Sequence, residues 1–270
     1  MLSIIICSAA FCLPPVEQRK LKVAAVSCVI EGGSPAKNLE QIAKWSKLAA
    51  EKGADLVLFN ETSATGYWQS LKLRKLAEPL DGPTVKQLIK IANENNIVIC
   101  AGMIEKAGDK AHNTQVIVGP KGLIGYHRKS RLPGGEEQWF DIGSDQNVFE
   151  VKGIKIGVAI CFESIQPDTC RTLTAKGSQV ILAPYCNGVS AADIHNGKRP
   201  YLSNRAKENH VWYIACDQFG LDNSKPDKPV SSGAVCFVNP KGEIVATTAL
   251  EEKKEHLIVY DLNLSLPDTK

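Results

Sequence analysis

The sequence predicts a single α/β domain in which mixed β-sheets pack together with helices on the outside. Three observations carry this prediction. Short apolar runs alternate with amphipathic segments along nearly the whole chain, and the strand-like runs outnumber the helical ones. Two pairs of runs are joined by the turn sequence Pro-Lys-Gly, which indicates hairpins beside crossover connections. No linker or low-complexity stretch divides the 270 residues.

The first half opens with a strand, after which Ser34 provides a helix N-cap and Pro35 the first helical position. Apolar residues at helical spacing continue this helix to Lys52. The elements expected in this half are strands at 21–29, 55–59 and 97–105, helices at 34–52 and 83–95, and a hairpin over 112–132 that turns at 119–122.

The second half repeats the rhythm of strands and helices. Its expected elements are strands at 154–160, 179–183, 211–216 and 256–261, helices at 167–176 and 199–209, and a hairpin over 235–247 that turns at 239–242. The two hairpins resemble each other, and helix-strand pairs recur in both halves. An internal duplication is therefore a hypothesis for the fold.

The domain is expected to occupy residues 21–264, between an N-terminal extension (1–20) and a C-terminal tail (265–270). Residues 1–13 are apolar, but this stretch is too short to cross a bilayer as a helix. It also lacks the positive n-region and the clean cleavage site of a secretory signal. We expect a loose extension, with a weak export signal as the alternative.

Charge and cysteine content exclude several classes of protein. The net charge of +3 and the pI of about 8.3 are too mild for a nucleic-acid binder, and nothing approaches transmembrane length. The nine cysteines are odd in number and form no CxxC pair, so neither a disulfide framework nor a zinc site is expected. A reducing, cytoplasmic compartment fits this pattern.

Two strand-like runs end in residues that could carry chemistry. Glu61 follows the apolar run DLVLF, and a carboxylate among apolar residues is a better base near neutral pH. Cys161 ends the run GVAIC, where a turn would expose its thiol and nearby main-chain N–H groups could receive an oxyanion. The alternatives are an ordinary strand cap and a core cysteine.

A third candidate lies in the basic segment His127–Arg131. Strand alternation would place His127, Lys129 and Arg131 on one face and the residues between them on the other. Such a segment is typical of a solvated edge strand. The functional interpretation is that Lys129 turns inward as an electrophile.

The order of these sites resembles the nitrilase superfamily of carbon–nitrogen hydrolases, from about residue 21 to residue 261. The resemblance is carried by EKGADLVLFNE, HNTQVIVGPKGLIGYHRKSRL, FDIGSD, GVAICFE, RAKENHVWYIAC and SGAVCFVNPKGEIVA. It implies a four-layer αββα sandwich, a homodimer or higher oligomer, and no metal or organic cofactor. The family's Glu-Lys-Cys triad maps onto Glu61, Lys129 and Cys161. The expected activity is hydrolysis of a small amide or N-carbamoyl compound through a cysteine thioester.

Family members often carry a second glutamate before an aromatic residue. Glu136 is the better match for it, and Glu137 is the alternative. Residues just after the strand ends are expected to bind substrate, with plain packing as the other interpretation of each: Tyr67, Phe162, Tyr185 and Asn187. The chain departs from the common pattern at Arg131 and at Asp217-Gln218, which bears on the substrate rather than on the chemistry.

Rival functions remain at this point. A papain-like hydrolase needs a histidine base, and none of the five histidines sits in a recognisable partner motif: His112, His127, His195, His210 and His256. A non-catalytic binding or assembly protein of the same fold is the alternative outside enzymes. A nitrile hydrolase is the alternative within them.

Overall fold

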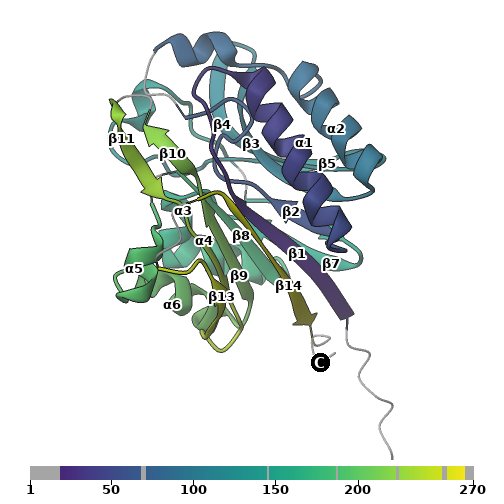
Figure 1. The fold of residues 1–270 in the computed structure, drawn as a ribbon, viewed down its shortest axis with the longest axis vertical. Helices are drawn as coiled ribbons and strands as arrows, with labels where there is room; N and C mark the ends of the chain where they lie inside the picture. Colours follow the sequence, from purple (N-terminus) through teal and green to yellow (C-terminus); the bar gives the residue numbers. More distant parts are fainter. Residues whose placement is uncertain are drawn as a thin grey trace, which may run out of the picture.

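The computed structural model describes residues 19–67, 71–144, 146–186, 188–222, 225–250 and 254–264. Two six-stranded sheets pack face to face, with helices on the outer face of each (Figure 1). The αββα layering expected from the family resemblance is confirmed. Within the described residues, no helix is both long enough and apolar enough to span a bilayer.

The first sheet has the strand order β14-β1-β2-β3-β4-β5. Its strands are β1 (Arg19–Ser27), β2 (Leu56–Leu58), β3 (Val98–Ala107), β4 (Lys110–Gly119), β5 (Gly122–Arg128) and β14 (His256–Leu264). The three central strands β1, β2 and β3 are parallel, and the other three join antiparallel.

The second sheet has the order β13-β12-β9-β8-β7-β6. Its strands are β6 (Val148–Val151), β7 (Ile154–Val158), β8 (Val180–Tyr185), β9 (Trp212–Asp217), β12 (Val235–Val238) and β13 (Ile244–Thr247). Three parallel strands again lie between one antiparallel strand and an antiparallel pair. Each sheet thus has the same succession of orientations, as the duplication hypothesis requires.

The helices in the described residues are α1 (Pro35–Glu51), α2 (Pro83–Asn95), α3 (Phe162–Ile165), α4 (Pro167–Ala175), α5 (Ala191–His195) and α6 (Pro200–Asn209), with 3₁₀ turns at Leu71–Leu76 and Glu136–Gln138. Four of these helices, α1, α2, α4 and α6, begin with a proline at the first helical position. Ser34 does occupy the N-cap of α1, but its hydroxyl donates to Glu31 rather than capping a backbone N–H.

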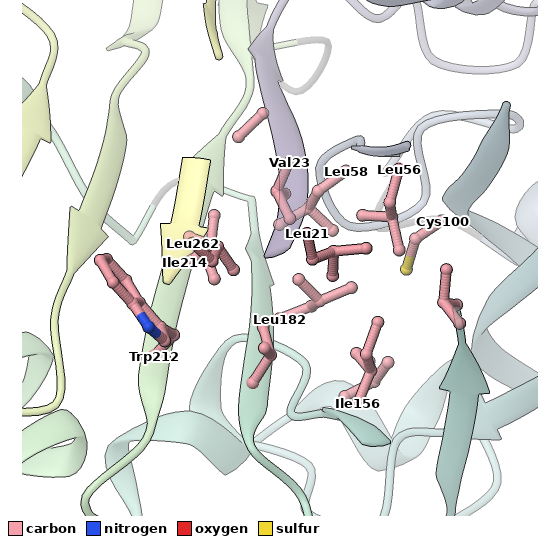
Figure 2. Packing of buried hydrophobic residues seen from close by; sticks show 14 of the residues in the cluster. Leu21, Val23, Leu56, Leu58, Cys100, Ile156, Leu182, Trp212, Ile214 and Leu262 are labelled. Carbon is pink, nitrogen blue, oxygen red and sulfur yellow. The ribbon is translucent and has the colours of Figure 1, made fainter. Parts of the chain in front are cut away.

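Alternation along the strands divides the core into three apolar layers. On β1, Leu21 and Val23 face the second sheet, whereas Ala24 and Val26 face α1 and α2. The layer between the sheets joins residues from both of them (Figure 2). Each large aliphatic side chain buried there contributes about 1.5–3 kcal/mol to the free energy of unfolding.

The predicted helices and strands are present with small shifts at their ends. The strand β6, the short helices α3 and α5, and the hairpin of β10 (Phe219–Asp222) with β11 (Lys225–Ser232) were not predicted. β6 has only four residues, and the sequence of β11, KPDKPVSS, lacks the apolar alternation of a strand. Residues 1–18 and 265–270 lie outside the described residues, and β1 begins ahead of the expected boundary at residue 21.

Candidate active site

Three strand ends deliver the predicted catalytic side chains to one edge of the two sheets. Glu61 follows β2 and Lys129 follows β5 in the first sheet, whereas Cys161 follows β7 in the second. The Glu61 N–H donates to the Tyr185 carbonyl at 3.3 Å, which links the sheets at this edge. The Cys161 N–H donates to the Pro184 carbonyl at 2.8 Å. The site is therefore built across the interface between the sheets.

Cys161 sits at a strained turn. Its φ of 48° and ψ of −107° lie outside the regions that residues other than glycine usually adopt. Such a conformation costs about 1–3 kcal/mol and is typical of functional positions. The turn leaves the cysteine half-buried, while Ala159 and Ile160, which connect it to β7, are fully buried. Thr62, directly after Glu61, has a positive φ of 51° as well.

Lys129 is fully buried and lies between two glutamates. Its Nζ donates to Glu61 Oε1 at 2.7 Å and to Glu136 Oε2 and Oε1 at 2.9 and 3.1 Å. Glu61 and Glu136 are 1% and 6% exposed. A buried ammonium needs such partners, because its desolvation alone would cost several kcal/mol.

The charges of this cluster set its protonation. Burial by itself would lower the pKa of Lys129, but the negative charges around it, with Glu61 foremost, hold that pKa well above its usual value. Burial and the Glu61 charge raise the pKa of Glu136, against the opposing effect of Lys129. Lys129 therefore stays a cation at neutral pH.

The Cys161 thiol is neutral in the resting site. Burial and the Glu61 carboxylate raise its pKa well above the usual value, although Lys129 and a hydrogen bond from the Cys186 N–H oppose this. A thiol is a weak nucleophile compared with a thiolate, so the site needs a proton acceptor. The strongest charges acting on this thiol are those of Glu61 and Lys129, which favours a carboxylate base over a histidine.

Asn113 orients the proposed base. Its side-chain Nδ2 donates to Glu61 Oε1 at 2.7 Å, and its main-chain carbonyl accepts a hydrogen bond from the main-chain N–H of Lys129 at 2.8 Å. Glu61 Oε1 thus accepts from both Asn113 and Lys129. No hydrogen bond from the described residues reaches Oε2, which is the oxygen left for proton transfer.

Of the two candidate glutamates, Glu136 contacts Lys129, whereas no hydrogen bond of the described residues joins Glu137 to it. Glu136 is buried, bonds Lys129 and accepts a 2.7 Å hydrogen bond from the Tyr67 hydroxyl. Glu137 is exposed and bonds the nearby Gly135 N–H instead. The half-buried Tyr67 therefore contacts the cluster through Glu136.

The other three predicted substrate-binding residues differ in their positions. Phe162 is half-buried directly after Cys161. Tyr185 is fully buried among apolar side chains, and its hydroxyl bonds Ser164 and Tyr213, so its position assigns it to the core. Asn187 lies outside the described residues.

The basic segment departs from the predicted alternation. β5 ends at Arg128, so Lys129 and Ser130 follow the strand rather than continue it. β5 does lie at an edge of the first sheet, but His127 and Lys129 are fully buried and Arg131 is exposed, so the expectation of a solvated segment is wrong for His127 and Lys129. Arg131 pairs with Asp168 at the surface. The alternation failed because the chain leaves the sheet at this point.

Sequence reasoning missed several residues around the site. Asn113 belongs to a buried polar run on β4, His-Asn-Thr-Gln, and polar residues inside a strand are a signal of this kind. Cys186 contributes its N–H to the thiol. Asp217, which the sequence analysis named only as a departure from the common pattern, is fully buried and accepts from the N–H groups of Gly188 and Val189, so it holds the loop after β8.

In the part of the chain that the structure describes, no group of three or more His, Cys, Asp or Glu side chains is arranged to hold a metal ion. The cluster at the strand ends instead has the composition of an acid, base and nucleophile set.

Comparison with known proteins supports the family resemblance. The family model described as carbon-nitrogen hydrolase matches residues 22–268. A nitrilase from Pyrococcus abyssi is 31% identical over 252 residues, covering 90% of this chain and 91% of the relative. An N-carbamoylputrescine amidase from Arabidopsis thaliana is 28% identical over 240 residues, covering 82% and 80% of the two chains.

Solved structures show the same fold. A mutant of the amidase from Nesterenkonia sp. AN1 superposes with a TM-score of 0.79 at 21% identity, covering 90% of this chain and 93% of that chain. That structure shows the Michael addition of acrylamide at the amidase's active-site cysteine. At this identity the likeness carries the αββα fold and nothing finer.

Proposed function

The chain belongs to the carbon–nitrogen hydrolase family, and on that premise we propose that it hydrolyses a small amide or N-carbamoyl compound through a thioester on Cys161. The bond cleaved is a non-peptide carbon–nitrogen bond, and the first product is ammonia or an amine. The amidases among the relatives favour this substrate class. Glu61, Lys129 and Cys161 are the proposed catalytic residues, with Glu136 as their support.

Acylation begins with proton transfer. Glu61 takes the Cys161 proton through Oε2, the oxygen that Asn113 and Lys129 leave open. The thiolate attacks the carbonyl carbon, and the tetrahedral oxyanion that forms accepts from Lys129 Nζ and the Phe162 N–H. Loss of one such donor typically costs about 2.7–4 kcal/mol of barrier.

Collapse of the tetrahedral intermediate then requires an acid. The protonated Glu61 donates to the leaving nitrogen, and ammonia or an amine departs. Glu61 next removes a proton from water, which attacks the thioester and releases the acid while the thiol is restored. One carboxyl group thus alternates between base and acid. Glu136 keeps Lys129 in place through both halves of the reaction.

The observation that carries this proposal is the buried bridge of Lys129 between Glu61 and Glu136 beside the strained Cys161 turn. Burying three ionisable side chains and straining a backbone both lower the free energy of unfolding. A protein that used this fold only for binding would gain nothing from that arrangement.

Ammonia release tests the proposal. Purified protein is incubated with small ω-amides, N-carbamoyl compounds and nitriles, beside a Cys161→Ala variant. We expect the wild type to release ammonia from an amide or N-carbamoyl compound, and the variant to release none. Equal release by both proteins would remove Cys161 as nucleophile. Release from nitriles alone would assign the nitrilase alternative, and no labelling of Cys161 by an electrophilic amide would favour a non-catalytic role.

Assembly, boundaries and location complete the proposal. We infer a homodimer or higher homo-oligomer with a hydrolase domain over residues 21–264, by analogy with the family. We also infer a cytoplasmic location, because all seven cysteines in the described residues are free thiols. Light scattering of the purified protein measures the oligomeric state. Fractionation of the source cells tests the cytoplasmic location.

A further inference from the structure

A further buried carboxylate, Glu163, lies next to the catalytic cluster and takes no part in the proposed reaction. It is fully buried in the first turn of α3, two positions after Cys161. Its Oε1 accepts from the Ser130 N–H and the Ser130 hydroxyl, each at 2.6 Å. Its Oε2 accepts from His127 Nε2 at 2.8 Å and the Ile160 N–H at 2.7 Å.

The donors to Glu163 flank two catalytic residues. His127 and Ser130 lie on either side of Lys129, in the segment that leaves the first sheet. Ile160 directly precedes Cys161 and lies two residues after the end of β7 in the second sheet. One carboxylate therefore ties the segment that carries the proposed electrophile to the turn that carries the proposed nucleophile.

We propose that Glu163 is a positioning residue that fixes the distance between Lys129 Nζ and the Cys161 thiol across the two sheets. The proposal rests on the function proposed above. Glu163 contacts neither substrate nor reacting atoms. It acts through the backbone of Ser130 and Ile160, whose N–H groups it holds at hydrogen-bond distance.

Each oxygen of Glu163 accepts from one backbone N–H, an arrangement that an ionised carboxylate satisfies at both oxygens. Burial disfavours the charge, yet His127 and the Ser130 donors lower the pKa of Glu163 below its usual value. A glutamine could not replace it, because each oxygen faces one backbone N–H. Whichever way the amide is turned, its NH₂ group meets either the Ser130 or the Ile160 N–H, and one link between the segments breaks.

Glu105, on β3 of the first sheet, offers a matched control. It is also a buried carboxylate, 1% exposed, and accepts from Arg128 Nε at 2.8 Å and Nη2 at 2.5 Å and from Thr114 Oγ1 at 2.8 Å. Its partners lie on β4 and β5, so it joins strands within the first sheet alone. Glu105→Gln thus disturbs a comparable buried network without touching the Cys161 turn.

The experiment compares Glu163→Gln with Glu105→Gln by three measurements: Tm, the kcat and KM for the best substrate, and the rate of Cys161 alkylation by iodoacetamide. We expect both variants to lower Tm. Only Glu163→Gln should lower kcat by about 100-fold, with KM within about threefold, because misplacement of a catalytic group by about 1 Å costs that much. Alkylation should slow by about tenfold or more in the same variant alone, since Lys129 then supports the thiolate less well.

A kcat and alkylation rate within about threefold of wild type in Glu163→Gln would overturn the proposal, as would equal losses in Glu105→Gln. If Glu163→Gln does not fold, Glu163→Asp takes its place, because its shorter side chain cannot keep the contacts to both the Ser130 and the Ile160 N–H, and an unchanged kcat in Glu163→Asp would also overturn the proposal. A wild type that releases no ammonia would refute the proposed function instead. The alkylation rates would still decide the role of Glu163 in that case.

Discussion

Removing the Lys129 ammonium tests the charge arrangement of the site most directly. In Lys129→Met the side chain keeps much of its length but loses the cation that bonds Glu61 and Glu136. Two buried carboxylates then face each other without a counter-charge. Breaking a buried ion pair from one side typically costs about 3–5 kcal/mol of the free energy of unfolding. At about 2–4 °C per kcal/mol, Tm should fall by roughly 6–20 °C.

The loss should depend on pH. The pKa of Glu136 is already raised by burial and by the Glu61 charge, and Lys129 opposes that rise. Without Lys129 we expect this pKa to rise further, so the folded variant holds a proton that the unfolded chain, with a glutamate pKa of about 4.3, releases. A raised folded pKa gives stability that is present at low pH and is lost as pH rises through that pKa. Lys129→Met should therefore approach wild-type stability near pH 4–5 and fall farthest behind it near pH 8.

Urea unfolding and thermal scans at pH 5 and pH 8 measure both effects. The double variant Lys129→Met/Glu136→Gln supplies the control, because it removes one of the two repelling charges. We expect it to regain about half or more of the stability lost at pH 8, while kcat stays about 10²–10³-fold below wild type for want of the oxyanion donor. Wild-type stability of Lys129→Met at pH 8, or no recovery in the double variant, would refute this account of the cluster.

Two further predictions concern residues that hold the catalytic glutamates. Tyr67→Phe removes the 2.7 Å hydrogen bond to Glu136, and a hydrogen bond to a charged group is worth about 1.5–3 kcal/mol, so kcat/KM should fall about tenfold to a hundredfold. Steady-state kinetics measure this, and a wild-type value would show that Glu136 needs no such support. Gly102→Ala would place a Cβ 2.1 Å from the Thr62 N, which forces the turn that carries Glu61 to move. We expect a roughly 100-fold lower kcat and a free energy of unfolding about 1–3 kcal/mol lower. Wild-type kinetics in a folded Gly102→Ala protein would show that the close approach of Gly102 to Thr62 does not position Glu61.

The sequence by itself determined the architecture and the identity of the three proposed catalytic residues. Apolar runs of strand length, prolines at first helical positions and the two Pro-Lys-Gly hairpins are local signals, and they predict elements because they act within a few residues. The family resemblance then indicated that Glu61, Lys129 and Cys161 correspond to the family's catalytic triad. Strand β6 and the β10–β11 hairpin were not predicted, because their sequences carry no such local signal.

The tertiary structure decided which side chains meet. Local pattern favoured an exposed edge strand for the basic segment, yet Lys129 is fully buried, since Glu61, 68 positions away, and Glu136 compensate its charge. The same reason separates Glu136 from the exposed Glu137, and it explains why the link from Glu163 to the Lys129 segment was invisible in the sequence. Burial of a charge depends on partners brought from distant parts of the chain, and periodicity within one element contains no information about them.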